Sequence, residues 1–550
     1  MSDLPASRYN LPCVDENLSR QARQRPDHCA IIYYGARFGY GWLDDQVETL
    51  ARALIRRFSV EQGERVAIAL QNSPHYVIAY YAILRAGAVV VPLNPMYRAE
   101  EISRILEDAD IRLALCGSEL TDRFQPGDSG DSRRDLKLIV AHYGDLLPEH
   151  PAATPPAVVT DLRPERLPAH CSDWRDVMRE SHAALPPISR STDDLCVMPY
   201  TSGSTAAPKG CDHRHSAVQH TAALQAESYE LTPQSVVTAV QPLYHVAGMQ
   251  GSMNAAILAG ATLLILTRWD AAAAIGLFAQ YGVTFWNAPP TMVIDMLSQE
   301  NFDPAAFASL QVITGGGSSM PPAVAEQLRA RFGLPYVEGY GMSETMSPTH
   351  LNPLAAPRNG SIGVVVQDTE SIVVDPDTLE PLPDGQTGEI WVRGPQLMLG
   401  YWNNEAATRE ALVQVDGKTW LRTGDIGRRD GEGYFHITDR LKRMINASGF
   451  NVSPAEVEQL LFGHEAVRQV CVIAAADSYR GETVKALIVL APAFRGRTRA
   501  EEIIDWARPR IAAYKAPRIV EFVDDLPLTP SHKVDWRRLQ DAERAAAFPD

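Results

Sequence analysis

The sequence predicts an α/β protein. It would have a large N-terminal domain, made of two similar α/β layers and a small β subdomain, followed by a small α+β C-terminal domain. Three observations predict this class. The 550 residues exceed what one hydrophobic core accommodates. A unit of apolar helix, glycine and buried strand occurs twice, which is typical of parallel sheets covered on both faces. From Glu370 onward, short strands and turns dominate.

The first helix–glycine–strand unit lies near the N-terminus. Arg65–Leu70 is predicted as a strand, Tyr76–Arg85 as a largely apolar helix, and Ala88–Val91 as a buried strand, with Gly87 ending the helix. Upstream, apolar side chains recur at helical spacing, so one face of that helix is buried: Leu43, Val47, Leu50 and Leu54.

The unit recurs in the middle of the chain. Residues 82–89 read Ala-Ile-Leu-Arg-Ala-Gly-Ala-Val, and residues 256–263 read Ala-Ile-Leu-Ala-Gly-Ala-Thr-Leu. This short match suggests two similar α/β layers, one on each side of the loop at residues 200–210. Residues 118–190 are rich in Pro, Gly, Asp, Ser and Arg, and we expect them to form a peripheral, partly mobile insertion.

Two smaller units are predicted after the α/β layers. Residues of about 360–440 would form a β subdomain that completes an N-terminal domain of residues 1–441, with strands at Ser371–Val374, Glu389–Arg393 and Tyr434–Ile437. Residues 442–550 would form the α+β C-terminal domain, with a strand at Val470–Ala474.

Composition narrows the class of protein. The net charge of −16 argues against nonspecific nucleic-acid binding. The acidic excess lies in residues 1–442, because residues 443–550 hold 15 basic and 15 acidic side chains. The seven cysteines form no Cys-x-x-Cys pair, which fits the reducing cytoplasm. We find no signal-peptide apolar core and no apolar run of membrane-spanning length.

One loop has the composition of a phosphate-binding site. Tyr200–Gly210 reads Tyr-Thr-Ser-Gly-Ser-Thr-Ala-Ala-Pro-Lys-Gly and follows a predicted strand at Leu195–Met198. Small residues let backbone N–H groups approach a ligand, hydroxyls add donors, and Lys209 adds a positive charge, which together suit a triphosphate. The loop lacks the Gly-Lys-[Ser/Thr] of a Walker A sequence. A flexible surface turn is the alternative interpretation.

Further segments combine glycines with polar side chains. Gly315-Gly316-Gly317 follows a strand-like run, Leu310–Thr314. The others are Glu338-Gly-Tyr-Gly-Met-Ser-Glu-Thr345, Arg422-Thr-Gly-Asp425, Tyr434-Phe-His-Ile-Thr-Asp-Arg-Leu-Lys442 and Pro527-Leu-Thr-Pro-Ser-His-Lys533. In this order and spacing the motifs resemble the adenylate-forming superfamily, which includes acyl-CoA synthetases, aryl-CoA ligases, luciferases and the adenylation domains of peptide synthetases. The resemblance covers nearly the whole chain.

The resemblance implies a role for each motif. The β- and γ-phosphates would be held by Thr201, Ser202, Gly203, Ser204, Thr205 and Lys209. The adenosine would be held by Gly315, Gly316, Gly317 and Tyr340 at adenine, Asp425 at the ribose hydroxyls and Arg440 near the ribose or phosphate. Glu344 would bind Mg²⁺ and Thr345 would contact the α-phosphate. The implied catalytic residues are Lys533, Thr345, Glu344 and Lys209, with Lys533 bridging the substrate carboxylate and the α-phosphate.

The resemblance also implies a rotation of the C-terminal domain about a hinge at Lys442. Rotation would carry Lys533 away and bring three residues to line a pantetheine channel: Ser448, Gly449 and Phe450. The chain departs from the family pattern at Ala206 and His532, where glycine is usual. We expect Ala206 to have a modest cost, whereas His532 could slow the repositioning of Lys533 or add a contact to the substrate carboxylate.

The segment Gln241–Met249 matches the region where acyl- and aryl-CoA ligases carry an aromatic or histidine gate, which would be His245. The acyl pocket is predicted to contain Val246, Met249 and Trp286, and its further lining candidates are Met253, Asn287, Ala288 and Val312. The resemblance also disfavours amino-acid substrates, because the amino-acid-activating relatives place an aspartate here to pair with the substrate ammonium, and this chain has Val246 and Ala247. A packed histidine at position 245 and a core tryptophan at position 286 are the alternatives.

The sequence therefore predicts an ATP- and Mg²⁺-dependent acyl-CoA synthetase in the cytoplasm. Its acid would be a medium- to long-chain fatty acid, with an aryl or alicyclic acid as the alternative. Transfer of the acyl group to a carrier protein instead of CoA stays open, as does a homodimer. A non-catalytic nucleotide-binding module is the alternative from another functional class.

Overall fold

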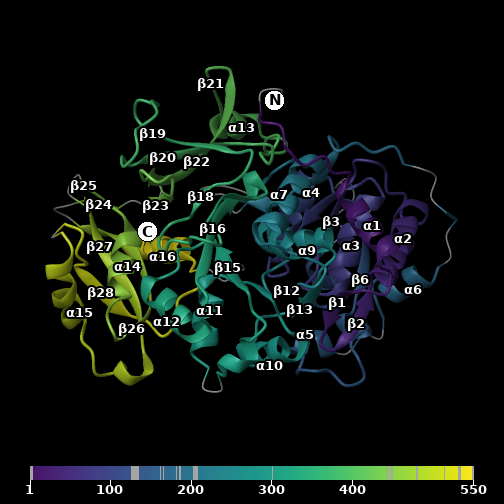
Figure 1. The fold of residues 1–550 in the computed structure, drawn as a ribbon, viewed down its shortest axis with the longest axis horizontal. Coiled ribbons are helices and arrows are strands. Elements are labelled where there is room, and N and C mark those ends of the chain that lie inside the picture. The colour runs from purple at the N-terminus through teal and green to yellow at the C-terminus, as the bar shows by residue number, and fades with distance from the viewer. Residues whose placement is uncertain are drawn as a thin grey trace.

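The computed structural model describes residues 4–124, 136–161, 163–164, 166–180, 183–184, 188–201, 208–299, 302–440, 443, 445–447, 450–477, 481–512, 514–529 and 534–547. Its architecture is the predicted one: a large N-terminal α/β part, a β subdomain and a small α+β C-terminal domain. In Figure 1 the C-terminal domain (yellow) lies beside the N-terminal part, and the β subdomain (green) stands above both.

Two large sheets form the N-terminal part. The nine-stranded sheet has the order β18 (Val364–Val365), β17 (Ser347–Leu351), β16 (Tyr336–Met342), β15 (Val312–Gly316), β14 (Phe285–Asn287), β12 (Val236–Ala239), β13 (Thr262–Ile265), β1 (Cys29–Tyr33) and β2 (Ala36–Gly39). The seven-stranded sheet has the order β11 (His213–Arg214), β8 (Leu195–Val197), β4 (Val89–Pro92), β3 (Arg65–Ala69), β5 (Leu113–Gly117), β6 (Lys137–Ala141) and β7 (Cys171–Asp173).

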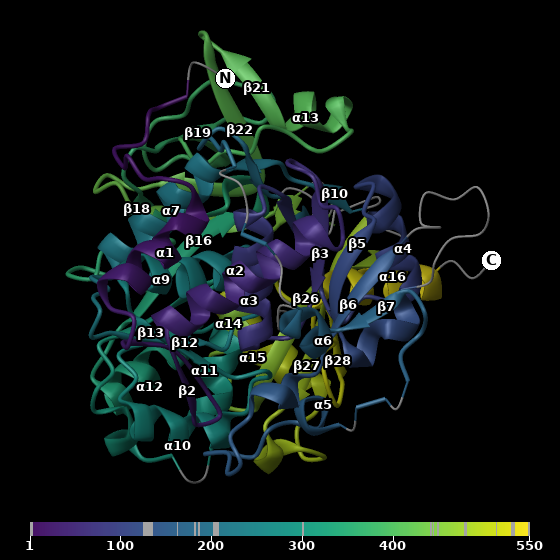
Figure 2. The ribbon, with the colours of Figure 1, turned by 90° about the vertical axis from the view of Figure 1, so that its right-hand side faces the viewer.

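A layer of helices lies between the two sheets (Figure 2). It contains α1 (Val14–Gln24), α2 (Tyr40–Arg56), α3 (Pro74–Arg85), α7 (His215–Ser228) and α9 (Ala255–Ala259). Every α3 residue from Pro74 to Leu84 is buried, which explains why this helix is apolar on all sides rather than on one stripe. Pro74 stands at its first position, and the Ser73 hydroxyl accepts a hydrogen bond from Tyr76 N.

The outer faces of both sheets carry their own helices. The nine-stranded sheet is covered by α10 (Ala271–Tyr281), α11 (Pro290–Leu297) and α12 (Pro322–Phe332). The seven-stranded sheet is covered by α4 (Ala99–Asp108). The short helices α5 (Ala157–Thr160) and α6 (Trp174–Arg179) lie in the later connections and contribute Val159, Trp174 and Val177 to the core between the two sheets. Both sheets are thus covered on two faces, which is why their central strands read as continuous apolar runs.

The repeated unit noted in the sequence has one location in each sheet. Helix α3 leads through Gly87 into β4, and α9 leads through Gly260 into β13. Both glycines have left-handed backbone angles, φ 78° and φ 75° respectively. A glycine in this conformation ends a helix without a steric penalty, so the same short turn sets the approach of both strands.

The expectation of a peripheral insertion at residues 118–190 needs correction. Within it, β6 pairs in parallel with β5, and β7 pairs in parallel with β6, so both are integral strands of the seven-stranded sheet. The β6 side chains from Leu138 to Ala141 are buried. The apolar run that forms β6 is only a few residues long and follows a polar, Pro- and Gly-rich stretch, which hid it from sequence reasoning.

The β subdomain is an antiparallel sheet of β19 (Glu370–Val374), β20 (Gly388–Arg393), β22 (Lys418–Arg429), β21 (Leu412–Val415) and β23 (Phe435–Arg440), with α13 (Glu405–Ala411) beside it. The C-terminal sheet contains β25 (Phe450–Val452), β24 (Ile445–Ala447), β27 (Gly481–Leu490), β26 (Val467–Asp477) and β28 (Ile519–Phe522). Its two faces are covered by α14 (Pro454–Leu461) with α15 (Ala500–Ala507), and by α16 (Trp536–Ala547). The boundary between residues 441 and 442 falls outside the described residues and stays a prediction.

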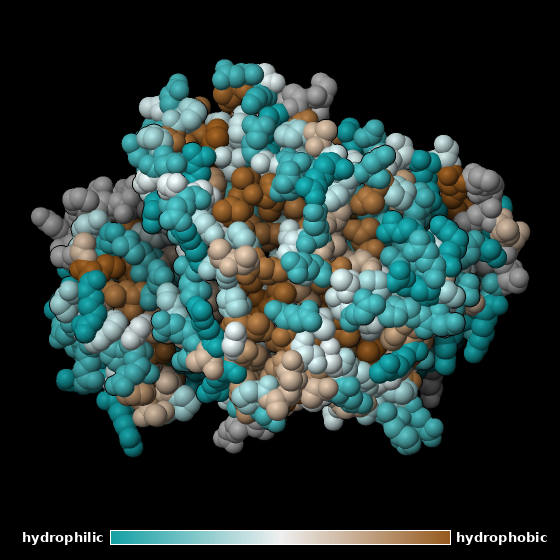
Figure 3. Space-filling view, viewed as in Figure 1, coloured by the Kyte–Doolittle hydropathy of each residue, from teal (hydrophilic) through white to brown (hydrophobic). Residues whose placement is uncertain are grey.

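No helix in the described part of the chain is both long enough and apolar enough to cross a membrane. The space-filling view shows teal, hydrophilic residues over most of the surface (Figure 3). Brown, apolar residues gather in the middle of this face.

Candidate functional site

The phosphate loop is carried by a two-stranded hairpin of β9 (Tyr200–Thr201) and β10 (Lys209–Gly210). In this antiparallel pair Thr201 lies opposite Lys209. The Tyr200 hydroxyl donates to Asp108 Oδ2 at 2.5 Å, which ties the hairpin to the end of α4. The hairpin thus places the predicted lysine and the first predicted hydroxyl side by side. Ser202, Gly203, Ser204, Thr205 and Ala206 lie outside the described residues.

Glu344, the predicted metal ligand, is a buried carboxylate with 8% exposure. The Tyr401 hydroxyl donates to its Oε1 at 2.7 Å. The ring of the same tyrosine faces Lys209, whose Nζ lies 4.9 Å from the ring centroid. Burial, reinforced by the Glu344 carboxylate, holds the pKa of Tyr401 well above its usual value, so this residue is a neutral donor. Sequence reasoning missed Tyr401, because nothing local marks it as a neighbour of residues 209 and 344.

Backbone hydrogen bonds bring these segments together. Met398 N donates to the Glu344 carbonyl at 2.9 Å, Leu399 N to the Asp212 carbonyl at 2.8 Å, and Trp402 N to the Gly210 carbonyl at 2.8 Å. His213 Nε2 donates to the Ser343 carbonyl at 2.7 Å. Burial lowers the pKa of His213 to about 4, so this histidine is a neutral structural donor.

The turn after Glu344 is held by its own hydrogen bonds. Met342 N donates to Thr345 Oγ1 at 3.1 Å, and this hydroxyl donates to the Ser347 carbonyl at 3.0 Å. Met346 and Ser347 have left-handed backbone angles, with φ of 49° and 73°. Such angles are costly for residues other than glycine and persist where the surrounding structure fixes them. The Thr345 hydroxyl lies inside this turn, and its contact with an α-phosphate stays a prediction.

The three-glycine motif is required first of all by strand packing. Gly315 and Gly316 belong to β15 and lie opposite Glu338 and Gly339 of β16. A Cβ atom at Gly315 would lie 2.0 Å from the Ala288 carbonyl oxygen, and one at Gly316 would lie 2.2 Å from the Gly339 carbonyl oxygen. Neither space admits a side chain. The third glycine, Gly317, has a φ of 83°, which only glycine adopts readily.

Asp425 and Tyr340 meet across two sheets. The Tyr340 hydroxyl, on β16, donates to Asp425 Oδ2, on β22, at 2.5 Å. Asp425 is 2% exposed, and its backbone N–H donates to Thr423 Oγ1 at 3.1 Å. Gly424 turns the strand with a φ of 70°. The predicted adenine residue and the predicted ribose residue are therefore in direct contact. Arg440 lies opposite Asp425 in the strand register.

Glu338 adds a third buried carboxyl group to the site, beside the glycines. It is 4% exposed, and Met320 N lies 3.4 Å from its Oε2. Burial raises the pKa of Glu338 to about 8, so the group is protonated and neutral at pH 7. The sequence showed a carboxylate in this motif, but only the depth of its burial reveals its protonation.

The predicted gate, His245, stands at the start of α8 (Val246–Gly248), where its Nδ1 accepts a hydrogen bond from Ala247 N at 3.3 Å. A π-helical segment, Met249–Asn254, follows directly. Val246, Met249 and Met253 join the core between the two sheets. Irregular helical turns of this kind often occur at functional sites.

Strand β14 separates the predicted pocket residues. Phe285 packs in the core between the two sheets, together with Met249 and Val246. Trp286, the next residue, points to the opposite face, where it stacks on Trp269 with ring centroids 5.8 Å apart. Successive residues of a strand face opposite sides, so Trp286 has the core-packing position that was its alternative interpretation.

Buried amides lie next to the predicted acyl pocket. Gln241 Nε2 donates to Asn287 Oδ1 at 2.8 Å, and Asn287 Nδ2 donates to the Ala247 carbonyl at 3.3 Å. A Cβ atom at Gly251 would lie 2.8 Å from both Asn287 Nδ2 and Gln225 Oε1. The sequence did not reveal this group, because its members come from α7, the residues after β12, the π-helical segment and β14.

Two stretches of the chain match models of known protein families. Residues 18–402 match the family model of the AMP-binding enzyme, and residues 456–533 match that of the AMP-binding enzyme C-terminal domain. The chain belongs to the AMP-binding enzyme family. The predicted membership of the adenylate-forming group, and of its acyl-CoA synthetase family, is confirmed. The class of enzyme is confirmed as well: an AMP-forming acid–CoA ligase.

Several relatives of this AMP-binding enzyme align over nearly their full length. A long-chain-fatty-acid–CoA ligase of Bacillus subtilis strain 168 is 32% identical over 98% of this chain and 97% of its own. A feruloyl-CoA synthase of an Amycolatopsis species is 34% identical over 94% of this chain and 96% of its own. The crystal structure of an anthranilate CoA ligase in complex with anthranoyl-AMP has a TM-score of 0.85 at 25% identity, covering 98% of this chain and 99% of its own.

Several predicted residues of this AMP-binding enzyme lie outside the described part of the chain: Lys442, Ser448, Gly449, His532 and Lys533. Phe450 begins β25, and only its backbone is described. Within the described ranges, no group of three or more His, Cys, Asp or Glu side chains forms a metal-binding cluster. A metal ion here would therefore need ligands beyond Glu344.

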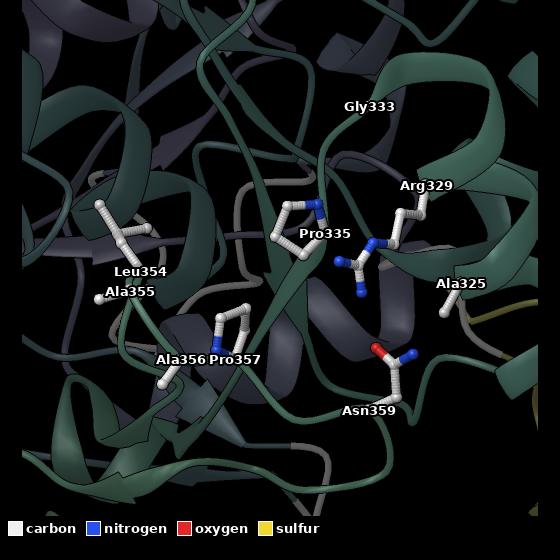
Figure 4. A pocket seen from close by; sticks show the side chains of 9 residues that line it. All are labelled: Ala325, Arg329, Gly333, Pro335, Leu354, Ala355, Ala356, Pro357 and Asn359. Atoms are coloured by element: carbon white, nitrogen blue, oxygen red, sulfur yellow. The ribbon is translucent and has the colours of Figure 1, made fainter.

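A surface pocket of about 380 Å³ lies beside α12 (Figure 4). It is lined by Ala325, Arg329, Gly333, Pro335, Leu354, Ala355, Ala356, Pro357 and Asn359. None of these residues is a predicted site residue. The pocket contains neither the phosphate loop nor the Tyr340–Asp425 pair, so the candidate site is defined by the converging motifs and not by this hollow.

Proposed function

We propose that this AMP-binding enzyme activates a carboxylic acid in two steps. In the first, a carboxylate oxygen attacks the α-phosphorus of ATP, the bond to the β-phosphate breaks, and pyrophosphate leaves. In the second, the thiol of CoA loses its proton and its sulfur attacks the acyl carbonyl carbon, so that AMP leaves. The observation that carries the proposal is the meeting of Lys209, Tyr401 and Glu344 at the phosphate loop, together with the direct contact of Tyr340 with Asp425.

The first step joins two anions, and the proposed residues address that problem. Two unit charges of like sign about 4 Å apart repel by about 4 kcal/mol at an effective dielectric constant near 20. Lys209 would neutralise charge on the departing phosphates, and Lys533 would neutralise it between the carboxylate and the α-phosphate. No general base is needed, because carboxylic acids are already ionised near pH 7. Catalysis then consists of positioning and electrostatic stabilisation.

Glu344 fits the proposed role of a Mg²⁺ ligand. Mg²⁺ prefers oxygen donors and is usually held by one or two carboxylates together with substrate phosphates and water. A single buried carboxylate beside a phosphate loop matches that donor set, and no larger cluster is present in the described ranges. When bound, Mg²⁺ would neutralise phosphate charge and orient the triphosphate.

The Tyr340–Asp425 pair supports the proposed nucleotide orientation. An ionised carboxylate can accept hydrogen bonds from both ribose hydroxyls, and Tyr340 fixes the direction that Asp425 faces. The protonated Glu338 lies opposite the glycines at the carboxyl end of β15, where the proposed adenine site would be. In open α/β sheets, ligands commonly bind at the carboxyl ends of the strands.

For the acid we propose a fatty acid of medium to long chain. Val246, Met249 and Met253 supply an apolar, adaptable surface behind the His245 gate. The long-chain ligase relative supports this class.

An aryl or alicyclic acid is the second candidate, and a specific observation favours it. The bonded amides of Gln241 and Asn287 offer polar partners that an alkyl chain cannot use but a ring with a polar substituent can. The feruloyl-CoA synthase relative agrees with this candidate. The two candidates therefore differ in whether the amides contact the acid.

The acceptor and the domain rotation belong to the same proposal. After adenylate formation, the C-terminal domain would rotate at Lys442, remove Lys533 and bring Ser448, Gly449 and Phe450 toward pantetheine. A carrier protein's phosphopantetheine presents the same thiol as CoA, so acceptor assays must separate the two. The scattered cysteines support a cytoplasmic location. The rival view, a nucleotide-binding module without catalysis, predicts binding without turnover.

The test is pyrophosphate release with ATP and Mg²⁺ across a panel of acids, with and without CoA. The panel runs from acetate to palmitate and includes benzoate, cinnamate, ferulate and cyclohexanecarboxylate. We expect release that depends on one acid class and that CoA accelerates. Acid-dependent pyrophosphate release that CoA does not accelerate would indicate that a carrier protein, and not CoA, accepts the acyl group. ATP binding without release for any acid would overturn the enzymatic proposal.

A further inference from the structure

The segment from Met398 to Trp402 runs through the candidate site although it belongs to none of the motifs found in the sequence. Its backbone donates hydrogen bonds to two site segments: to Glu344, and to Gly210 and Asp212 at the end of the phosphate-loop hairpin. Tyr401 is also bridged to Cys211, two residues after Lys209. The segment therefore holds the phosphate-loop hairpin and the Glu344 turn at a fixed separation.

The Tyr401 side chain makes one contact with each of those two units. Its hydroxyl donates to Glu344 Oε1 at 2.7 Å, and its ring centroid lies 4.9 Å from Lys209 Nζ. The first contact is a charge-assisted hydrogen bond, and the second is a cation–π contact. One side chain thus joins the acidic and the basic member of the site through two chemically separable groups.

Other contacts fix Tyr401 itself. Tyr401 N donates to Thr408 Oγ1 at 2.9 Å, and the same hydroxyl donates to the Asn404 carbonyl at 2.8 Å. On the next residue, Trp402 Nε1 donates to the Asp108 carbonyl at 2.9 Å, and Arg65 lies 4.6 Å above the Trp402 ring. The backbone that carries the Tyr401 side chain is therefore held at residue 401 itself and at its neighbour Trp402.

We propose that Tyr401 is a positioning residue for the metal–triphosphate complex: its hydroxyl sets the orientation of the Glu344 carboxylate, and its ring sets the position of the Lys209 ammonium. This inference rests on the proposed roles of Glu344 and Lys209. Residues that orient a metal ligand typically change metal affinity or activity by about 10- to 100-fold when removed. Tyr401 acts through these two side chains and touches no reacting atom.

Two substitutions separate the two contacts. Tyr401→Phe removes the hydroxyl and keeps the ring beside Lys209. Tyr401→Leu removes both. We expect Tyr401→Phe to weaken binding of α,β-methylene-ATP in the presence of Mg²⁺ by about tenfold or more, while binding in EDTA changes little. We expect Tyr401→Leu to weaken binding in EDTA as well, by a few fold, about the strength of an exposed cation–π contact.

Isothermal titration calorimetry measures these affinities without turnover. Tyr434→Phe is the matched control, because Tyr434 also donates its hydroxyl, to the Ala356 carbonyl at 2.8 Å, and also lies under a cation, with Arg358 3.9 Å from its ring. Its hydroxyl contacts no predicted site residue, so both nucleotide affinities should match the wild type. Thermal unfolding of each variant checks that the fold persists.

Glu344→Gln distinguishes a failure of this inference from a failure of the proposed function. If Glu344→Gln binds the Mg²⁺ complex as well as the wild type does, the metal role of Glu344 is wrong. If Glu344→Gln loses that affinity and Tyr401→Phe does not, only the role of Tyr401 is wrong. Equal losses for Tyr401→Phe with Mg²⁺ and with EDTA would also overturn it, because they would indicate general damage to the loop. When Glu344→Gln and Tyr401→Phe are combined, the loss of nucleotide affinity in Mg²⁺ should be smaller than the sum of the two single losses in free energy, because both substitutions act on the same carboxylate.

Discussion

The nucleotide end and the acid end of the candidate site are built differently. At the nucleotide end, each carboxylate has a tyrosine hydroxyl directed at it, from Tyr401 to Glu344 and from Tyr340 to Asp425. At the acid end, Val246 and Met249 pack without polar contacts of their side chains, next to amides bonded to one another. The first end is fixed by directional bonds, and the second by packing.

This difference follows from what each end has to recognise. A triphosphate and a ribose carry charges and hydroxyls at fixed positions, so hydrogen bonds to them must be aligned in advance. An acyl group offers mainly area, and hydrophobic contact is not directional. Substitutions at the nucleotide end should therefore affect every acid alike, whereas substitutions at the acid end should change the ranking of acids.

The largest effect on the reaction is expected at the nucleotide end, from Lys533→Ala. Removing a charge that stabilises the transition state should slow adenylate formation by about 10²- to 10³-fold for every acid. The thiol step, started from preformed acyl-adenylate, should remain largely intact. Both rates are measured separately, by pyrophosphate release and by acyl-CoA formation.

Lys418→Ala is the control for that variant, because Lys418 is an exposed lysine paired with Glu370 in the β subdomain. It should leave both half-reactions unchanged. An equal fall of both half-reactions in Lys533→Ala would show that the two steps do not use separate arrangements of the C-terminal domain.

A smaller effect is expected from Asp425→Asn. The substitution keeps the shape of the side chain and removes the charge that Tyr340 and the proposed ribose contacts depend on. We expect the KM for ATP to rise by about tenfold or more, as for loss of a hydrogen bond to a charged group, with the ranking of acids unchanged. Asp416→Asn, at an exposed turn with a φ of 52°, should leave the KM unchanged. If Asp425→Asn changed the ranking of acids, the nucleotide end and the acid end would not act independently.

Gly251→Ala should change the ranking of acids and leave the KM for ATP unchanged. Its new Cβ would lie 2.8 Å from the Asn287 and Gln225 amides, so the amides must shift. Overpacking of this kind costs about 1–3 kcal/mol. We expect kcat/KM to fall by about tenfold or more for the preferred acid and to change less for smaller acids, while the KM for ATP stays the same.

Gly276→Ala is the matched control for Gly251→Ala. This glycine lies within α10, and a Cβ there would meet nothing within 4 Å. It should leave the ranking of acids unchanged and raise the free energy of unfolding by about 0.5–1 kcal/mol. If Gly251→Ala left the ranking unchanged too, the amide group would not belong to the acid end.

The smallest effect on the reaction, but a clear one on stability, is expected from Glu338→Gln. Burial raises the pKa of Glu338 from 4.5 to about 8, so the folded protein keeps a proton that the unfolded chain has lost. This retained proton contributes a few kcal/mol at most to the free energy of unfolding. The contribution is complete below about pH 4.5 and is lost as the pH rises through about 8.

Glutamine carries no such proton, so Glu338→Gln should flatten the fall of the unfolding midpoint between about pH 5 and pH 8.5. Thermal unfolding of both proteins across this range measures the difference. The same pH dependence in the variant and the wild type would contradict the buried, protonated state of Glu338.

Sequence alone determined the elements whose cause is local. The helix of α3 and the glycine turns at Gly87 and Gly260 follow from apolar runs and from the backbone freedom of glycine. The motif at Lys209 was recognisable because phosphate binding uses small residues, hydroxyls and a positive charge close together in the chain, whereas Glu344 and Asp425 were assigned through the resemblance to the adenylate-forming superfamily. The class of enzyme followed from their order.

Only the tertiary structure decided what depends on residues distant in the sequence. It made β6 a strand of the sheet by pairing it with β5, and it turned Trp286 away from Met249 through the alternation of one strand. Burial in the folded protein raises the pKa of Glu338, and the packing of distant segments places Tyr401 between Lys209 and Glu344. Burial, strand register and contacts between distant segments arise when the chain packs, and no local pattern encodes them.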